Sequence, residues 1–169
     1  MKSVLINKKP KTFAVVFDTG DEVVSGLKTF ARENRLSASQ FTAIGAFSNA
    51  RLGFFNIAER GYKKIPINEQ VEVLSLLGDI TLGENEPAVH AHVVLGKSDG
   101  TAHGGHLLEA HVRPTLEVIL TEAPKHLHRL PDPATGLPLI HLGTGPERGL
   151  NGKSPQKRGN SKRIPGRRR

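Results

Sequence analysis

The chain contains 169 residues with a formal net charge of +8, and its length fits one domain. It has no cysteine, which excludes disulfides and thiolate metal sites, and none of its apolar runs reaches the length of a membrane span. Because the first ten residues also lack the apolar core of a signal peptide, we expect a cytoplasmic protein without a membrane partner.

The excess positive charge is confined to the C-terminal segment. Nine of the 24 Lys and Arg residues lie from Gly143 onward, with one of the 16 Asp and Glu residues, so residues 1–142 carry fifteen of each sign. Leu150 and Ile164 are the only large apolar residues of this segment, which therefore cannot bury enough surface to offset its chain entropy. The sequence predicts a neutral domain over residues 1–142 and a disordered basic tail over residues 143–169.

The beginning of the domain predicts a strand followed by a helix. Residues 12–17 are mostly β-branched and aromatic, which favours a strand. Thr19 and Glu22 have the spacing of a capping box, with Thr19 at the N-cap. Apolar residues then recur at helical spacing from Val23, and we expect the helix to end near Asn34.

The rest of the domain predicts β-strands. Pro66 indicates an edge strand or a strand end, Gly78-Asp79 is expected to end another strand, and order is doubtful between residues 124 and 138, where prolines recur. The expected strands are residues 41–47 and 52–57, joined by a hairpin at 48–51, then 62–67, 71–77, 116–121 and a terminal strand at 139–142 that closes the sheet. Together these elements predict an α+β fold, a mainly antiparallel, partly closed β-sheet with one packed α-helix.

Three histidines are predicted to converge on one point. His90 and His92 have strand spacing, so both rings leave the same face. Asp99-Gly100 is a strong hairpin signal, and a turn at that point places His92 opposite His106, whose preceding Gly-Gly pair permits a bulge or a close backbone approach. Three imidazoles on one face are the minimum set for a divalent metal with an open position, and neutral imidazole favours zinc and similar ions.

Other interpretations of these histidines stay open. Alternating histidines on a half-exposed sheet are also ordinary polar residues, and eight histidines allow some clustering by chance. His103 and His111 have the opposite parity from His106 and are expected outside the site. Glu109 has that parity too, but a bulge would let it act as a general base beside a metal-bound water. The remaining histidines are expected at the surface: His126, His128 and His141.

An ordered series of motifs resembles one known family. It includes residues 72–80, the pair His90 and His92, Asp99-Gly100 and residues 104–109, with residues 44–47 upstream and 115–119 downstream. Over residues 12–122 this pattern resembles the PPC domain, whose name stands for plants and prokaryotes conserved.

The resemblance implies an antiparallel sheet with a packed helix, assembled as a homotrimer. It also implies that His90, His92 and His106 occupy positions that look metal-binding in prokaryotic members, and the arrangement is similar to the zinc site of acetolactate decarboxylase, a fold relative. Plant members carry AT-hook segments and act as chromatin-associated DNA-binding regulators, and prokaryotic members are commonly described as DNA-binding. Plant members lack these histidines, so a metal site and a DNA role need not occur together.

The tail departs from the family pattern, because it follows the domain and has Pro165-Gly166-Arg167 where an AT-hook needs Gly-Arg-Pro. Its cations suit contact with phosphates and little sequence preference. The preferred interpretation is therefore a DNA-binding protein of the PPC type, with a regulatory role and a nucleoid location. The expected DNA contacts are Lys157, Arg158, Lys162, Arg163, Arg167, Arg168 and Arg169.

Two alternatives to DNA binding remain. In the first, the three histidines hold a catalytic zinc, and a small carbonyl or carboxylate substrate binds at the open position. In the second, the metal only stabilises the fold or the trimer. The sequence identifies no nucleophile with an activating motif, so DNA binding is preferred over enzymatic activity.

Overall fold

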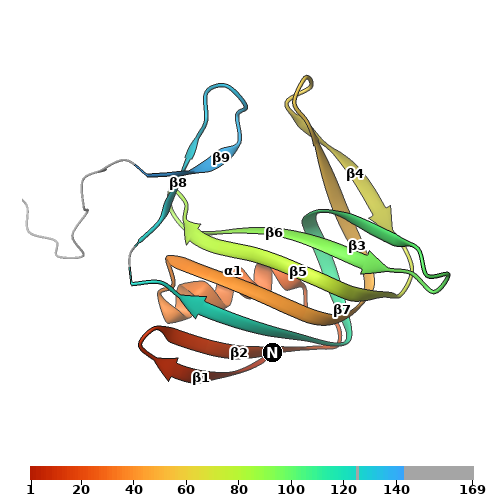
Figure 1. The fold of residues 1–169 in the computed structure, drawn as a ribbon, viewed down its shortest axis with the longest axis horizontal. Coiled ribbons are helices and arrows are strands. Elements are labelled where there is room, and N and C mark those ends of the chain that lie inside the picture. Colours follow the sequence, from red (N-terminus) through yellow and green to blue (C-terminus); the bar gives the residue numbers. More distant parts are fainter. Residues whose placement is uncertain (125, 143–169) are drawn as a thin grey trace, which may run out of the picture.

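A nine-stranded β-sheet and one helix make up the part of the chain that the computed structural model describes, residues 1–124 and 126–142, with only the backbone of residues 3–7 (Figure 1). The predicted basic tail, residues 143–169, lies outside the described residues. The elements are β1 (Lys2–Lys8), β2 (Lys11–Asp18), α1 (Val23–Asn34), β3 (Ala38–Asn56), β4 (Gly61–Ile67), β5 (Val71–Leu82), β6 (Pro87–Gly96), β7 (Ala102–Glu122), β8 (His128–Pro131) and β9 (Pro138–His141).

The sheet is antiparallel except at one point, and it is not a closed barrel. Its main path is β1-β2-β7-β3-β5-β8-β9, with β4 paired to β3 and with β6 paired to both β5 and β7. The exception is β8, which meets β5 in parallel at the single pair Leu82 and His128. The predicted α+β class is therefore confirmed: closure is partial, through the bridging position of β6.

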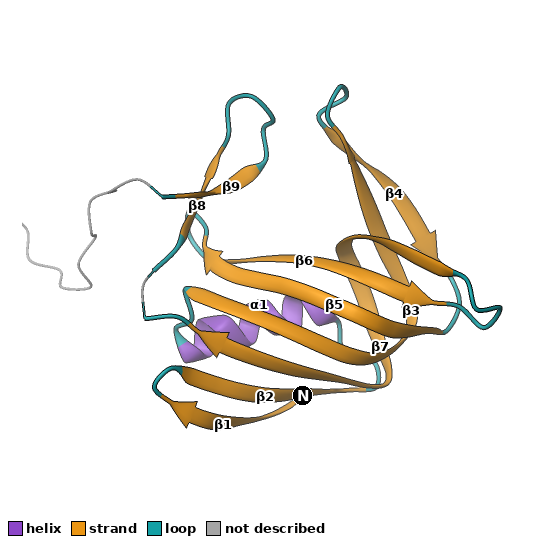
Figure 2. Ribbon diagram, in the orientation of Figure 1, coloured by secondary structure: helices purple, strands orange, loops and turns teal. Residues whose placement is uncertain are grey.

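Helix α1 packs against one face of the sheet (Figure 2). Its buried face consists of Val23, Leu27, Phe30 and Ala31, and the Phe30 ring meets Phe13 of β2 edge-on, with ring centroids 5.2 Å apart. This contact belongs to one hydrophobic core between the helix and the sheet, to which α1, β2, β3, β5, β6 and β7 all contribute. No helix within the described ranges is long and apolar enough to cross a membrane.

The N-cap of α1 is Glu22, and the prediction of Thr19 at this position was wrong. The Glu22 carboxylate accepts hydrogen bonds from the backbone N–H groups of Val24 (3.0 Å) and Ser25 (2.7 Å). Thr19 instead donates its hydroxyl to the carbonyl of Pro114, 2.9 Å away. The helix ends at Asn34, as predicted.

Strand β3 runs without interruption through the hairpin that was predicted at residues 48–51. Ala50 of this segment pairs with Ile67 of β4 on one side and with Ala110 of β7 on the other. Pairing on both sides overrides the local turn tendency of Ser48 and Asn49. The turn comes later, between β3 and β4, where Arg60 has a left-handed φ of 48°.

Strand β5 also continues past its predicted end at Gly78-Asp79 and stops at Leu82. Glycine is needed at position 78 because a Cβ there would lie 2.3 Å from the Phe41 ring and 2.6 Å from the His90 carbonyl oxygen. Gly78 thus marks a close approach of neighbouring strands, and the adjacent Asp79 remains part of the sheet.

The C-terminal strand forms, but it does not close the sheet as predicted. Among the described residues, strand β9 pairs only with β8, and this hairpin, β8–β9, projects from the sheet (Figure 1). All four residues of β9 are exposed, so neither face of this strand packs on the core. The hairpin is nonetheless fixed at its start, where the Leu127 carbonyl accepts from the Leu82 N–H (2.8 Å) and the Leu127 N–H donates to the Ser37 carbonyl (3.1 Å).

Candidate metal centre

The predicted hairpin places the three histidines side by side. His90 and His92 lie on β6, and His92 is directly opposite His106 of β7, as predicted. The turn between these strands is held by Asp99, whose carboxylate accepts from the backbone N–H (2.9 Å) and the hydroxyl (2.6 Å) of Thr101. Gly100 follows with a φ of 82°, which favours glycine.

The three rings can reach one ion. One ring nitrogen from each of His90, His92 and His106 lies within 4.8 Å of the other two, and the Nε2 atoms of His90 and His92 are 3.2 Å apart. Two imidazole nitrogens on a tetrahedral zinc lie about 3.4 Å apart, given zinc–nitrogen distances of about 2.0–2.1 Å. Small side-chain rotations therefore suffice to bring all three nitrogens to ligand distance.

Close backbone packing around the glycine pair fixes the position of His106. A Cβ at Gly105 would lie 3.0 Å from the Gly53 carbonyl oxygen of β3, and one at Gly104 would lie 3.2 Å from the Val93 carbonyl oxygen of β6. The pair therefore lets β7 pass closely between its two neighbours, which is one of the two roles predicted for it. The other role, a bulge, appears just after His106, where the pairing of β7 with β3 shifts between Arg51 and Leu52.

The environment of His90 and His106 favours the neutral form of both rings. Burial, reinforced by His90 and His92, lowers the pKa of His106 to about 4. Burial and the nearby Arg129 guanidinium lower the pKa of His90 as well. Neutral imidazole is the form that binds metals.

One ring nitrogen of the cluster has no hydrogen-bond partner among the described residues. This nitrogen is Nδ1 of His106, which is buried. Buried polar atoms are nearly always paired, so an orphan of this kind is what a metal-ligating ring would present. The residues present thus fit a divalent ion by residue type, spacing and protonation state.

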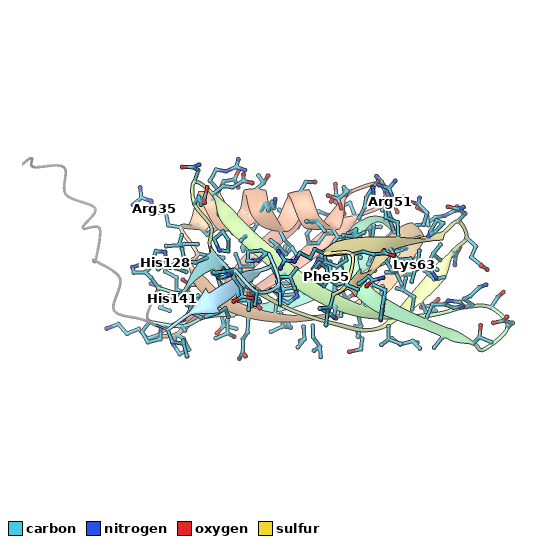
Figure 3. The ribbon with its side chains drawn as sticks, turned by 90° about the horizontal axis from the view of Figure 1, so that it is seen from above. Arg35, Arg51, Phe55, Lys63, His128 and His141 are labelled. Carbon is cyan, nitrogen blue, oxygen red and sulfur yellow. The ribbon has the colours of Figure 1, made fainter. Side chains whose placement is uncertain are left out.

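Two strand pairs, β3–β4 and β8–β9, contribute side chains that border the cluster. The β3–β4 ribbon supplies Tyr62, whose ring stacks on His106 with centroids 4.9 Å apart. The β8–β9 hairpin supplies Arg129, whose Nη2 lies 3.0 Å from Nδ1 of His90. Seen from above, the labelled residues of the hairpin (His128 and His141) lie to one side, and those of the ribbon (Phe55 and Lys63) to the other (Figure 3).

The sequence did not identify Tyr62, Asp79 or Arg129 as neighbours of the site. The Asp79 carboxylate holds Arg129 through two contacts of 2.8 and 2.9 Å and lies 3.7 Å from His90 Nδ1. Asp79 had the pattern of a turn residue and Arg129 lay among prolines, so neither carried a local signal. Alternation along β5 could have found Asp79, because it faces His90 directly across the β5–β6 ladder.

The other candidate side chains lie outside the cluster. The bulge after His106 puts Glu109 on the same side of β7 as His106, but its carboxylate pairs with Arg51 at 2.8 Å. His103 pairs with Leu95 and is exposed, and His111 Nδ1 lies 3.2 Å from Asn49 Oδ1. The histidines expected at the surface are exposed there: His126, His128 and His141.

The fold and the three-histidine cluster together define a class of protein, an α+β domain with a candidate metal centre on a β-hairpin. Residues 6–124 match the family described as the Plants and Prokaryotes Conserved (PCC) domain, and the chain belongs to that family. No curated protein sequence matches the chain. The β8–β9 hairpin lies beyond the matched residues.

Several solved structures share this fold. A plant- and prokaryote-conserved protein from Pyrococcus horikoshii is 31% identical, with a TM-score of 0.74 and coverage of 83% of this chain and 94% of that chain. A metal-containing protein from Archaeoglobus fulgidus is 34% identical, with a TM-score of 0.73 and coverage of 78% and 93%. A protein from Bacteroides thetaiotaomicron, whose name gives DNA binding as a suspected role, is 28% identical, with a TM-score of 0.74 and coverage of 77% and 91%.

The predicted likeness to acetolactate decarboxylase is weak. A Staphylococcus aureus protein described as similar to that enzyme is 14% identical, with a TM-score of 0.46. These values are too low to transfer an activity.

Proposed function

We propose that the protein binds a divalent metal ion through His90, His92 and His106. The single observation that carries the proposal is the convergence of the three imidazole rings across the β6–β7 hairpin, with their ring nitrogens within 4.8 Å of one another. The donor set of three imidazoles suits zinc and other late first-row metals. The related protein from Archaeoglobus fulgidus is called metal-containing, which supports the proposal without naming the metal.

Three protein ligands leave a position for water or another ligand. A metal bound there would act as a Lewis acid and would lower the pKa of a bound water. His92 is exposed, which leaves the cluster accessible to a small molecule. A small carbonyl or carboxylate compound is therefore the class of ligand to test, and a purely structural ion would bind none.

Metal analysis of protein purified without an affinity tag tests the proposal. We expect about one metal ion per chain, and we expect His92→Ala to abolish the occupancy because two imidazoles bind far more weakly than three. His103→Ala, on the same hairpin but outside the cluster, should retain the metal. Metal-free wild-type protein whose stability does not respond to a chelator would contradict the proposal.

We propose DNA binding through the basic tail as a second, separate function. The tail holds nine of the chain's cations while residues 1–142 are neutral, and related proteins carry names that give DNA binding as a suspected role. Contact with phosphates releases counterions, so affinity should fall steeply with salt and depend little on sequence. If the protein is a homotrimer, three tails would act together and gain from effective concentration.

A salt titration of duplex binding separates the tail from the domain. The titration compares the full chain with a full-length variant. In this variant Gln replaces the seven expected contact residues, Lys157, Arg158, Lys162, Arg163, Arg167, Arg168 and Arg169. We expect the variant to lose most of the affinity and to show a shallower salt dependence. Equal binding by both proteins would overturn the role of the tail.

A further inference from the structure

The β8–β9 hairpin is joined to the candidate metal centre by one buried side chain. Arg129, which is 8% exposed, donates from Nη1 to the Pro138 carbonyl (2.8 Å) and so ties the two strands of the hairpin together. Its Nη2 donates to both oxygens of Asp79 at 2.8 and 2.9 Å and lies 3.0 Å from His90 Nδ1. The same guanidinium therefore contacts the hairpin, the sheet and a candidate metal ligand.

The contact with Arg129 determines where the hydrogen of the His90 ring lies. A guanidinium can only donate, so His90 Nδ1 is the acceptor and the hydrogen of the neutral ring is on Nε2. That Nε2 is 3.2 Å from Nε2 of His92, which can accept the hydrogen. In this arrangement a hydrogen occupies the place on His90 where a metal would bind.

Metal binding at Nε2 of His90 requires the other tautomer of the ring. The ring hydrogen must then be on Nδ1, where it would point at a donor of Arg129, and two facing donors repel each other. The acceptor nearby is Asp79, whose Oδ2 lies 3.7 Å from His90 Nδ1. Metal-ligating histidines commonly donate their second nitrogen to a carboxylate, which fixes the orientation of the ring.

We propose that Asp79 is a positioning residue that accepts the His90 Nδ1 hydrogen in the metal-bound protein, and that this bond replaces the contact between His90 and Arg129. The proposal rests on the proposed metal function. Metal binding at Nε2 and the contact of Arg129 with Nδ1 then require opposite tautomers of the His90 ring, so metal binding and full docking of the β8–β9 hairpin exclude each other. By thermodynamic reciprocity, metal binding then weakens the attachment of the hairpin to the sheet.

The expected change in the hairpin is a loosening. Arg129 keeps its bonds to Asp79, and the backbone bonds of Leu127 with Leu82 and Ser37 remain. Loss of one hydrogen bond should speed local opening roughly 2- to 10-fold. In hydrogen–deuterium exchange on the full wild-type chain, zinc should accelerate exchange over residues 128–141 and leave α1 unchanged.

A zinc titration by chelator competition supplies the second readout. Asp79→Asn should bind zinc about 10- to 100-fold more weakly, because the neutral amide oxygen is a weaker acceptor than the carboxylate and the amide NH2 can instead donate to His90 Nδ1. Glu69→Gln is the matched control: Glu69 is also paired with a cation, Lys97 at 2.7 Å, but it lies outside the cluster. This variant should bind zinc as the wild type does.

The outcomes separate the two proposals. If the wild-type protein binds no zinc, the proposed metal function fails and the role of Asp79 fails with it. If the wild type binds zinc but Asp79→Asn binds it equally well, or if zinc slows exchange in the hairpin, the metal site stands and the present proposal is overturned. The exchange experiment uses only wild-type protein, so it decides the matter even if Asp79→Asn does not fold.

Discussion

His106 is the most strongly perturbed of the three clustered histidines. Tyr62 stacks on its ring, its Nδ1 is buried, and its pKa is about 4. Burial accounts for most of this shift, because a charged imidazole loses more hydration than a neutral one when it is removed from water. His106 therefore remains available to a metal well into the acidic range.

The same shift predicts how the stability of the metal-free protein depends on pH. The unfolded chain binds a proton at His106 near the ordinary pKa of about 6.5, whereas the folded chain does so only near pH 4. Stability should thus fall as the pH is lowered from about 6.5 to 4 and should change no further through this group below pH 4. With allowance for solvent screening, the loss is on the order of 2 kcal/mol.

Denaturant unfolding of the chelator-treated protein at several pH values measures this effect. His106→Gln should remove that part of the pH dependence, whereas His103→Gln, an exposed histidine on the same strand, should keep it. If His106→Gln and the wild type have the same pH profile between 6.5 and 4, burial of His106 is not the cause.

At the level of elements, local patterns predicted the β6–β7 hairpin well and the long strands poorly. The hairpin depends on neighbours in sequence, the Asp99-Gly100 turn and the alternation of His90 and His92, so the sequence contained its register. Strand β3 depends instead on partners that are distant in sequence, and those partners override the turn tendency of its middle. Long-range pairing is the physical reason for the wrong hairpin at residues 48–51.

The residues of the candidate site also differ in whether the sequence predicted them. The three histidines were predicted because one hairpin carries them all. Tyr62, Asp79 and Arg129 arrive from β4, β5 and β8, and only the folded sheet brings them to the cluster. Local spacing does not encode the contacts of Tyr62 and Arg129, whereas alternation along β5 indicates Asp79 once β5 is paired with β6.

The cap of α1 gives an element-scale prediction. Burial alone would raise the pKa of Glu22, but hydrogen bonds from Ser25, Val24 and Ala110 outweigh it and lower that pKa. Glu22→Ala removes this cap and should lower the free energy of unfolding by about 1–2 kcal/mol. Thermal or denaturant unfolding measures the change, with Glu33→Ala, an exposed residue in the last turn of α1, as the control. Equal losses in both variants would show that the cap is not the source of stability.

At the scale of the whole molecule, the sheet leaves an apolar patch exposed on the side away from the helix. It consists of four residues from four neighbouring strands: Ile44, Leu77, Val94 and Ile119. Exposed large apolar side chains on neighbouring strands are typical of an interaction site. It lies beside the cluster, since Leu77 is directly opposite His92 in the sheet. We propose this patch as the interface of the homotrimer that the family resemblance implies.

Light scattering of the intact chain tests this assembly. We expect a mass of three 18.3 kDa chains, and we expect Leu77→Asp to shift the protein toward the monomer because a charge in the patch opposes its burial. Leu142→Asp, at a residue that is 86% exposed and outside the patch, should leave the mass unchanged. A wild-type monomer would refute the trimer, and a Leu77→Asp trimer would exclude this patch from its interface.

We propose that one chain carries two separate activities, a metal centre in the neutral domain and DNA contact in the basic tail. X-ray absorption spectroscopy of the zinc-loaded protein tests the metal centre most directly, because it counts the imidazoles bound to the ion. We predict three imidazole nitrogens at about 2.0–2.1 Å and one further light-atom ligand. An ion with fewer than three imidazoles, or one surrounded by six oxygens, would contradict the proposed site.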